Sequence, residues 1–448
     1  MNVRQNLLVK RLAPQLTALA CAALAASMLP VQAQNLADLY QAARSYDAGY
    51  QSALSAANAT LARGEQAKAG IWPTAGFQAG VSRSWIDSST ANNSNFGGQS
   101  ASLTASQPLY RPVNKLNFEQ GEKQAYIAKA QLLAAEQDLI IRTSQAYFDV
   151  LAALDTLTFV LAQKAAVSEQ LASAKRNFEV GTSTITDTRE AQARFDLVTA
   201  QEIAAENDVR VKKMALDQLV GKSNVDPKPL VIPLTLPSLT PNDVSQWVAA
   251  TETSHPSISQ ARLALEVAQL ETAKAEAGNK PTLDLNASFG SSRNQGSAAN
   301  TANTSSTSGN IALAFNWPIF TGFAVQNRIK ETLALEDKAR SDLDVAKRTV
   351  AQATRAAFFG VQSGLSSVKA FEAAEFSTQS ALDANKLGYQ VGVRINIDVL
   401  NSQSQLFQTK RDLAKARYDV LLGGLKLRQA NGTLKAEDLA PVNALLAR

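Results

Sequence analysis

Two stretches in each half of the chain alternate apolar and polar side chains with a period of two. In the second half, apolar residues occupy the odd positions from 283 to 289 and again from 311 to 317. The first half repeats the pattern between Phe77 and Trp85, and more weakly around Leu103. Segments about ten residues long with one apolar face are typical of transmembrane β-barrel strands. The predicted barrel strands are about 74–86, 100–109, 282–292 and 310–318.

Each pair of predicted strands encloses a long polar loop rich in turn-forming residues, at 87–99 and at 293–310. One such hairpin alone would be most simply an ordinary surface hairpin. The two long polar loops favour barrel hairpins instead, with the loops outside the barrel facing water. Four strands are too few to close a pore, and an open sheet in lipid would leave backbone groups unpaired. We therefore expect several chains to share one barrel, and three chains of four strands would give twelve.

A long segment with almost no helix-breaking residue follows each pair of strands. Residues 113–178 contain one glycine and no proline, and apolar positions step by three and four, as in a coiled coil. At about 1.5 Å per residue this helix would be about 100 Å long, which suits a rod crossing a periplasm rather than a compact enzyme. The other predicted helices are 36–70, 188–219, 256–277, 325–387 and 399–430.

The two halves are copies of one large unit. Val180-Gly181 matches Val391-Gly392, and Asp187 matches Asp398, at one constant offset of 211 residues. Earlier positions match at offsets of 208 to 210, so the copies differ by very short gaps. The predicted organisation is a signal peptide (1–33), a first repeat (34–230) with its hairpin tip at about 180–187, a Pro-rich extended linker (226–241), and a second repeat (242–448) with its tip at about 391–398.

The N-terminus has the pattern of a secretory signal. Basic residues precede a short apolar region, Leu16 to Leu29, and Val31-Gln32-Ala33 forms a small-x-small cleavage site. The mature chain is expected to begin at Gln34. Cys21, the one cysteine, lies inside this segment. Its lipidation stays open, although Ala18 argues against it, since lipidated cysteines usually have Leu three residues earlier. A mature chain without thiols has no disulfide and no cysteine-based metal site.

Charge and composition exclude several functions. The net charge of +5 includes three basic residues of the first 33, which leaves +2 and no clustered basic face for nucleic acid. No later segment approaches the roughly 18–20 continuous apolar residues of a membrane-spanning helix, so a membrane crossing would use a β-barrel. The chain has no phosphate-binding loop, catalytic triad or metal-ligand cluster, and His255 is most simply a helix-capping residue before Pro256. We predict no enzyme activity, no cofactor and no metal.

The motifs, taken in order, resemble the TolC-type outer-membrane efflux proteins. The likeness is sharpest from Gly388 to Leu400, and it continues at 413–418, at 431–434 and at 318–322 after a strand. The resemblance implies a membrane β-barrel joined to a long α-helical coiled-coil barrel. It also implies a homotrimer with twelve strands in outer-membrane lipid and its helices in the periplasm. A periplasmic adaptor and an inner-membrane transporter, either proton-driven or ATP-driven, would complete the machine.

The alternative to this duct is a periplasmic adaptor. An adaptor would have one helical hairpin flanked by small β-domains, rather than two copies that each carry barrel strands. Within the duct class, the sequence leaves open whether the cargo is drugs, metals or proteins.

The resemblance also implies a gate at the hairpin tips. The tip turns contain Gly181 and Gly392, and the positions matching the latch that closes the periplasmic end are Thr186, Asp187, Tyr389 and Arg394. Asp398 and Asn401 match the constriction ring; Asn401 replaces an acid, so a trimer would carry three carboxylates rather than six and bind cations more weakly. Helix N-capping is the structural alternative for Asp187 and Asp398.

Overall fold

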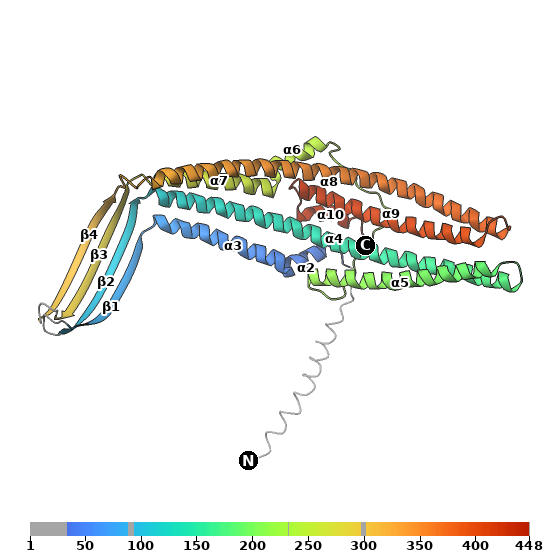
Figure 1. Ribbon diagram of the computed structural model, residues 1–448, viewed down its shortest axis with the longest axis horizontal. Helices are drawn as coiled ribbons and strands as arrows, with labels where there is room; N and C mark the ends of the chain where they lie inside the picture. The colour runs from blue at the N-terminus through green and yellow to red at the C-terminus, as the bar shows by residue number, and fades with distance from the viewer. Residues whose placement is uncertain (1–33, 88–93, 232, 297–301, 448) are drawn as a thin grey trace, which may run out of the picture.

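The computed structural model describes residues 34–87, 94–231, 233–296 and 302–447. The predicted signal peptide with Cys21, and the central part of each polar loop, lie outside these residues. The molecule is strongly elongated, with a β-sheet at one end and the tips of two helical hairpins at the other (Figure 1). The strands and the hairpin tips therefore lie at opposite ends of the molecule.

Each repeat consists of a broken helix, two strands and a helical hairpin. The first contains α2 (Leu36–Tyr46), α3 (Ala48–Lys68), the short η1 (Ala69–Ile71), β1 (Thr74–Ile86), β2 (Ser94–Tyr110), α4 (Pro112–Glu179) and α5 (Ile185–Val220). The second contains α6 (Val244–Ser254), α7 (Pro256–Ala277), β3 (Thr282–Gln295), β4 (Asn303–Asn316), α8 (Ala324–Gln390) and α9 (Asn396–Ala430), followed by η2 (Ala436–Asp438) and α10 (Leu439–Asn443).

The first predicted helix, 36–70, was wrong as one continuous element. It breaks at Asp47, whose carboxylate accepts a hydrogen bond from the backbone N–H of Tyr50 at 2.8 Å and so caps α3. His255 occupies the equivalent break between α6 and α7, where its Nδ1 accepts from Ser257 N–H at 3.1 Å. A capping side chain at each break satisfies a backbone donor that would otherwise lack a partner.

Two predicted strands had wrong ends. β2 begins at Ser94 rather than at 100, and β4 covers Asn303–Asn316 rather than 310–318. The outer halves of these strands are rich in serine, glycine and asparagine, so no apolar alternation marks them. Backbone pairing defines them instead, as in the pair Gln295↔Asn303. Pro318 lies beyond the observed end of β4, where its ring nitrogen has no N–H for a ladder.

The four strands form one antiparallel sheet in the order β1-β2-β3-β4. Thr74 pairs with Ser106 in the first repeat, and Thr282 pairs with Asn316 in the second. Thr282 lies 208 residues after Thr74, and Asn316 lies 210 residues after Ser106, so equivalent residues pair in the two hairpins and their register is the same. Large apolar side chains remain exposed along the strands: Phe77, Val81, Trp85, Leu103, Phe289, Ile311, Leu313 and Phe315.

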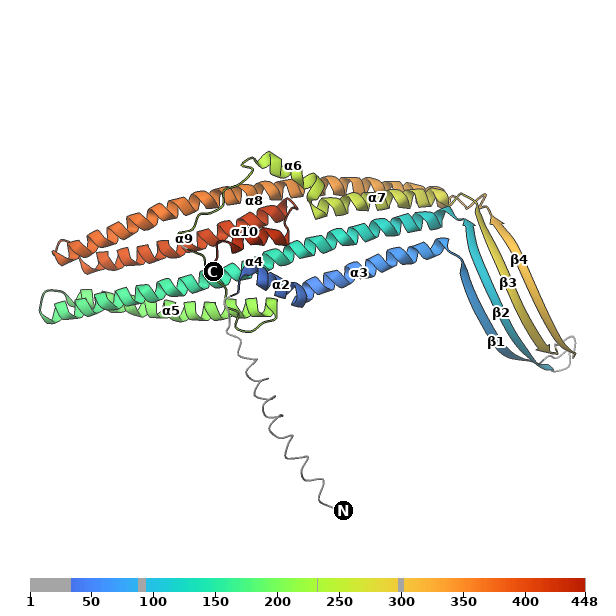
Figure 2. The same cartoon turned by 180° about the vertical axis from the view of Figure 1, so that it is seen from behind.

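The helices next to the sheet form a single row. α3, α4, α7 and α8 lie side by side in that order in both views, continuing the order of the strands (Figures 1 and 2). α4 packs against α3 on one side and α7 on the other, so it joins the two repeats. At the start of α4, Arg111 donates two hydrogen bonds to Asp284 of β3, at 2.8 and 2.7 Å. This bidentate pair ties the first helical hairpin to the sheet of the second repeat.

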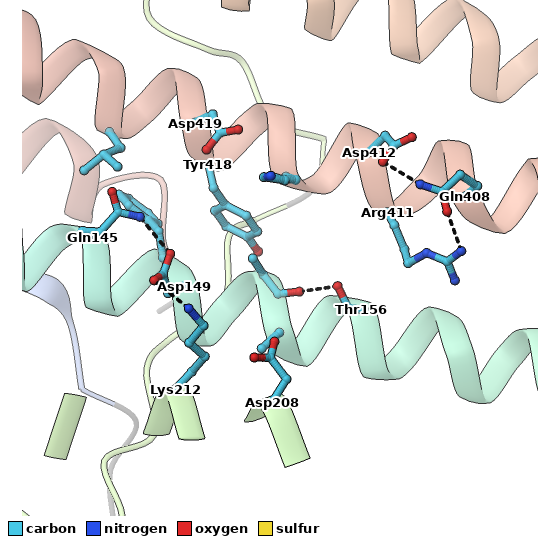
Figure 3. Close-up of a pocket in the computed structure, with 15 residues that line it drawn as sticks. Gln145, Asp149, Thr156, Asp208, Lys212, Gln408, Arg411, Asp412, Tyr418 and Asp419 are labelled. Carbon is cyan, nitrogen blue, oxygen red and sulfur yellow. Dashed lines mark hydrogen bonds and ion pairs between the residues drawn. The ribbon is translucent and has the colours of Figure 1, made fainter. Parts of the chain in front are cut away.

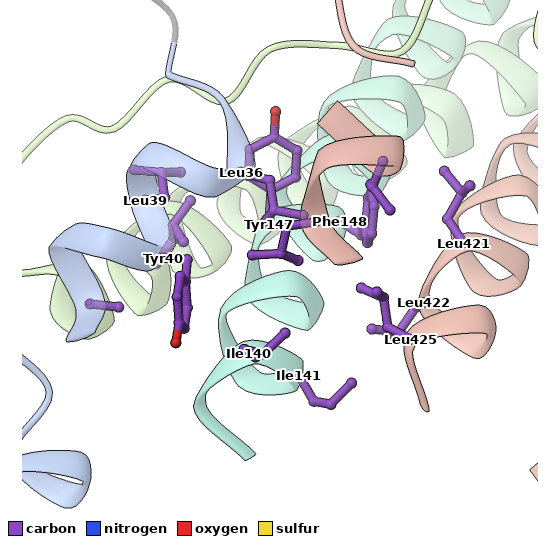
Figure 4. Packing of buried hydrophobic residues seen from close by; sticks show 14 of the residues in the cluster. Leu36, Leu39, Tyr40, Ile140, Ile141, Tyr147, Phe148, Leu421, Leu422 and Leu425 are labelled. Atoms are coloured by element: carbon purple, nitrogen blue, oxygen red, sulfur yellow. The ribbon is translucent and has the colours of Figure 1, made fainter. Parts of the chain in front are cut away.

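The largest apolar cluster lies near the middle of the molecule. Figure 4 shows Leu36 and Tyr40 of α2 facing Tyr147 and Phe148 of α4, with Leu425 of α9 nearby. The Pro-rich linker crosses this region in an extended form, and the Tyr147 hydroxyl donates to the carbonyl of Lys228 at 2.8 Å. The core therefore joins the ends of both hairpins to the N-terminal helix.

By length and composition alone, α4 is the one helix among the described residues that could cross a membrane. It packs against α2, α3, α5, α7 and α9. A helix that meets neighbours on several sides needs apolar residues around much of its circumference. Contacts between helices therefore account for part of its apolar character.

Candidate functional site

The two hairpin tips have the same backbone. Gly181 and Gly392 both have left-handed backbones, with φ of 80° and 78°, and a Cβ added at either residue would meet no atom within 4 Å. The tips are shorter than predicted, because the returning helices begin at Ile185 and Asn396. The N-cap residues Thr184 and Ile395 are β-branched, which fits their extended backbone.

A capping box closes the first tip. The Thr184 hydroxyl accepts from Asp187 N–H at 3.2 Å, and the Asp187 carboxylate accepts from Thr184 N–H at 3.0 Å. Ser183 donates to the same carboxylate at 2.7 Å. Burial raises the pKa of Asp187, but the hydrogen bonds from Ser183 and Thr184 outweigh it and hold the pKa below its usual value. Asp187 thus caps from the third helical position, not from the N-cap itself.

The second tip lacks such a cap. Its N-cap residue is Ile395, whose side chain makes no capping hydrogen bond. Arg394 Nη1 lies 3.8 Å from Asp398 Oδ2, and these side chains are 58% and 34% exposed. An exposed pair at this distance contributes about 1 kcal/mol or less. The Arg394 side chain is therefore only weakly held. Asp398 lies three residues after the N-cap residue Ile395 and is not itself the N-cap.

The structure does not bring the four predicted latch residues together within one chain. The Tyr389 hydroxyl accepts from the Asn177 amide of the other hairpin at 3.3 Å. Thr186 is exposed at the start of α5. Among the described residues, Arg394 pairs with Asp398 and makes no ion pair with Asp187. A latch between neighbouring subunits stays a prediction.

Asn396 connects the two hairpins and was not predicted from the sequence. It is fully buried, with a relative exposure of 0%. Its amide donates to the Asp187 carbonyl at 3.2 Å, and its side-chain oxygen accepts from the Gln170 amide. The matching position of the first repeat is Ile185. The sequence signal that could have indicated this contact is the polar Asn396 at a position where the first repeat has the apolar Ile185.

A second link joins the tips a little further from the turns. Arg194 of α5 donates to the side-chain oxygen of Asn401 at 2.8 Å. Asn401, predicted in the constriction ring, therefore bonds to the first hairpin of its own chain. Buried apolar residues support this contact, with Leu400 packed against Val167 and Val198. The second hairpin is thus fixed to the first by polar and apolar contacts together.

The same boundary continues toward the core as a polar groove between α4, α5 and α9, with a cavity of about 500 Å³ (Figure 3). Lys212 pairs with Asp149 at 3.2 Å. Gln408 donates to Asp412 at 2.9 Å and accepts from Arg411 at 2.8 Å. Arg411 of α9 also donates to Gln163 of α4 at 3.2 Å, so the groove contributes to hairpin packing.

One half-buried carboxylate, Asp155, lies beside this groove. Tyr418 donates to Asp155 at 2.6 Å across the α4–α9 boundary. Burial raises the pKa of Asp155, although the hydrogen bond from Tyr418 acts in the opposite direction. The boundary between the hairpins therefore carries polar contacts from the tips to the core.

Comparison with known proteins gives consistent matches over nearly the whole chain. The family model for outer membrane efflux proteins matches twice, at residues 39–222 and 247–433. The outer membrane protein TolC of Vibrio cholerae is 32% identical over 437 residues, covering 97% of this chain and 98% of TolC. The alkaline protease secretion protein AprF of Pseudomonas aeruginosa is 28% identical, over 92% of this chain and 87% of AprF.

A solved structure shares the fold. The CmeC outer membrane channel of Campylobacter jejuni superposes with a TM-score of 0.77 at 16% identity, over 92% of this chain and 90% of CmeC. The two separate family matches also fall on the two repeats described above. The sheet and the helical hairpins belong to one shared architecture.

Proposed function

Because the chain belongs to the outer membrane efflux protein family, we propose that three copies form a closed duct with a gate at the hairpin tips. The chain is an outer-membrane exit duct of efflux or secretion systems, and its helical part lies in the periplasm. Three sheets of four strands would make a twelve-stranded barrel, and the rows of helices would continue it as a tunnel.

The observation that carries the proposal is the open four-stranded sheet. β1 and β4 are its edges, and large apolar side chains are exposed along the strands. In lipid, each unpaired backbone group costs several kcal/mol, so the edges must pair with other strands. Neighbouring copies supply suitable edges, because β1 and β4 are antiparallel in the same way as β2 and β3.

The proposed gate uses the weakly bound side chains of the second tip. Arg394 is exposed, and its one ion pair among the described residues is with Asp398, so we propose that it reaches a carboxylate or carbonyl of a neighbouring subunit. In this proposal Thr186 and Tyr389 receive such contacts near the tips, while Asp187 mainly caps α5. Three copies of Asp398 would form an acidic ring at the constriction, and Asn401 would line the next turn.

A duct has no energy source, so it needs partners. We propose that a periplasmic adaptor joins the tips to an inner-membrane transporter, either proton-driven or of the ATP-binding type. The matched family is named for efflux, whereas AprF is named for protease secretion. Protein export is therefore the second candidate beside small-molecule efflux. Adaptors that co-purify with the chain would separate the two.

Planar bilayer recordings of the detergent-purified protein test the duct and its gate. We expect channels of low conductance, a clear increase in Arg394→Ser, and loss of block by trivalent cations in Asp398→Ala. Lys175→Ser is the matched control, because Lys175 is an exposed base near the first tip. Unchanged conductance in Arg394→Ser would remove Arg394 from the gate. A soluble monomer without channel activity would end the proposal.

A further inference from the structure

Two arginines lie on the face of the sheet that is otherwise apolar. Side chains alternate between the two faces of a strand, so Arg83 of β1 shares the face of Phe77. Pairing carries this face across the sheet, because Phe77 lies opposite Leu103 and Leu103 lies opposite Phe289. Arg293 follows Phe289 by four residues in β3 and therefore lies on the same face.

This apolar face is the one that meets lipid in the proposed barrel. The opposite face carries polar and small residues such as Gln78, Ser82, Ser102 and Asn286, which suit a water-filled lumen. An arginine on the lipid face is unfavourable at the middle of a bilayer and tolerated near its surfaces. The depth of the two arginines in the membrane therefore decides what they can contact.

Both arginines lie at the outer limit of the apolar residues. In β3, no large apolar side chain follows Phe289. In β1, Arg83 lies two residues before the exposed Trp85, and tryptophan is enriched where a bilayer meets water. The C-terminal ends of β1 and β3, where the arginines are found, lie away from the periplasmic helices (Figure 1). The arginines are therefore at the level of the outer leaflet.

A hydrogen bond directs Arg83 toward this surface. Its Nε donates to the side-chain oxygen of Asn95 at 3.0 Å, and Asn95 pairs with Trp85, one step further from the helices. A guanidinium group has five N–H donors, so this bond leaves the terminal nitrogens available.

The strand between the two arginines leaves room for a ligand. Gly97 of β2 lies opposite both Arg83 and Gln295. A Cβ added at Gly97 would lie 3.2 Å from Gln295 Oε1, so the Gln295 amide lies over this glycine. Gln99, the next residue on the same face of β2, lies opposite Arg293. Two guanidinium groups and two amides thus surround a position without a side chain.

The arginines are close enough to bind one headgroup. They are two strands apart, and their registers differ by two residues. With strands about 4.8 Å apart and a rise of about 3.4 Å per residue, their Cα atoms are about 12 Å apart. Two arginine side chains that lean toward each other can contact a common anionic group across this distance.

The surrounding charge favours an anion. Among the described residues, neither Arg83 nor Arg293 forms an ion pair. The acid of β3, Asp284, binds Arg111 at the other end of the sheet, and Asp87 follows β1 as an exposed residue. Residues 88–93 and 297–301 contain neither acids nor bases. The outer part of the sheet therefore carries two bases and one acid.

We propose that Arg83 and Arg293, together with Gln99 and Gln295, bind the phosphorylated headgroup of a lipid in the outer leaflet. This inference rests on the proposed barrel and adds a ligand on its outer surface. Arginine forms directional, charge-assisted hydrogen bonds with phosphate. The two glutamine amides add further donors. A lipid with two phosphates matches the two separated guanidinium groups.

Native mass spectrometry of the detergent-purified oligomer tests the site, with diphosphoryl lipid A and its dephosphorylated form as probes. We expect the diphosphoryl form to bind at least tenfold more tightly. Equal binding of the two forms would exclude phosphate recognition. Displacement of the lipid by millimolar inorganic phosphate would assign the site to a free anion and overturn the lipid proposal.

The chain offers a matched control, because Ser84 and Ser292 each stand beside one of the arginines on the opposite face. Exchanging both pairs (Arg83→Ser with Ser84→Arg, and Arg293→Ser with Ser292→Arg) keeps the composition and the net charge but moves both bases to the lumen face. Affinity for diphosphoryl lipid A should fall at least tenfold. Arg83→Gln with Arg293→Gln should give the same loss and serves if the exchanged chain does not assemble.

Channel recordings separate this site from the proposed duct. Both variants should still form channels in planar bilayers, because neither changes the strand pairing or the hairpin tips. Unchanged lipid affinity in a variant that forms channels would overturn the lipid site and leave the duct standing. A wild-type protein that stays monomeric and forms no channels would overturn both.

Discussion

The two hairpin tips share a turn of nearly identical backbone but are held by different bonds. The first tip closes on itself through Ser183, Thr184 and Asp187. The second has an isoleucine at the N-cap and makes polar contacts with the first hairpin through Asn396 and Tyr389. The backbone of the turn is thus the same in both repeats, but the hydrogen bonds that stabilise it differ. The second hairpin is therefore the one whose position can be altered by breaking contacts with its surroundings.

The largest effect should come from Asn396→Ala. It would leave the Gln170 amide without its partner and remove the additional hydrogen bond to the Asp187 carbonyl, and loss of a partner costs a buried polar group about 1–3 kcal/mol. Hydrogen exchange should show faster opening of residues 391–400, with little change at 180–189. The control is Asn401→Ala, which removes one exposed contact and should cost less. Equal protection in Asn396→Ala and wild type would contradict the dependence of the second tip on the first.

Next in size are the two glycine substitutions. Gly181→Ala and Gly392→Ala should each cost about 1–2 kcal/mol, because a left-handed backbone strains an L-residue. No atom lies close to either site, so the two costs should agree. Local hydrogen exchange at each tip measures them. A much larger effect at Gly392 would mean that the second tip contacts another subunit.

A smaller change comes from exchanging the caps. Thr184→Ile should weaken the first tip by about 1 kcal/mol, the usual loss of a hydroxyl N-cap. Ile395→Thr should stabilise the second by a similar amount, since Asp398 already occupies the position that completes a capping box. Exchange rates of α5 and α9 at their first turns would move in opposite directions. Parallel changes would show that the capping box does not distinguish the tips.

The smallest expected effect is a pH dependence confined to the first tip. The lowered pKa of Asp187 means that its contribution is present above the usual aspartate pKa of about 3.9. It is lost as the pH falls below that value and through the lowered pKa. Opening of residues 183–190 should therefore increase in this acidic window. Asp187→Asn is the control and should remove the dependence; a persistent dependence would assign it to another group.

Much of the architecture could be predicted from periodicity and the internal repeat. Period-two stretches located the strands, the constant offset located both tips, and the run of prolines indicated the linker. The outer half of β4 could not be located this way, because Asn303 to Gly309 has no apolar alternation and is defined by pairing with β3. The helix break at Asp47 was missed because the surrounding residues favour a helix on both sides.

The site was harder to predict than the fold. The position of each tip follows from Val-Gly and the repeat, which are local signals. The bonds of Asn396 and Arg194 join hairpins more than 200 residues apart in sequence, and no local pattern encodes a contact of that kind. Only the mismatch between Ile185 and Asn396 at equivalent positions marked the place where the repeats diverge.

The open edges of the sheet have a consequence for the journey to the membrane. Before it assembles with other copies, a newly exported chain would have β1 and β4 as two unpaired edge strands, which are templates for aggregation. We expect the chain to need escort by a chaperone while it crosses the periplasm. The polar outer half of β4, from Asn303 to Gly309, would make the unescorted strand less prone to adhere to unrelated polypeptides.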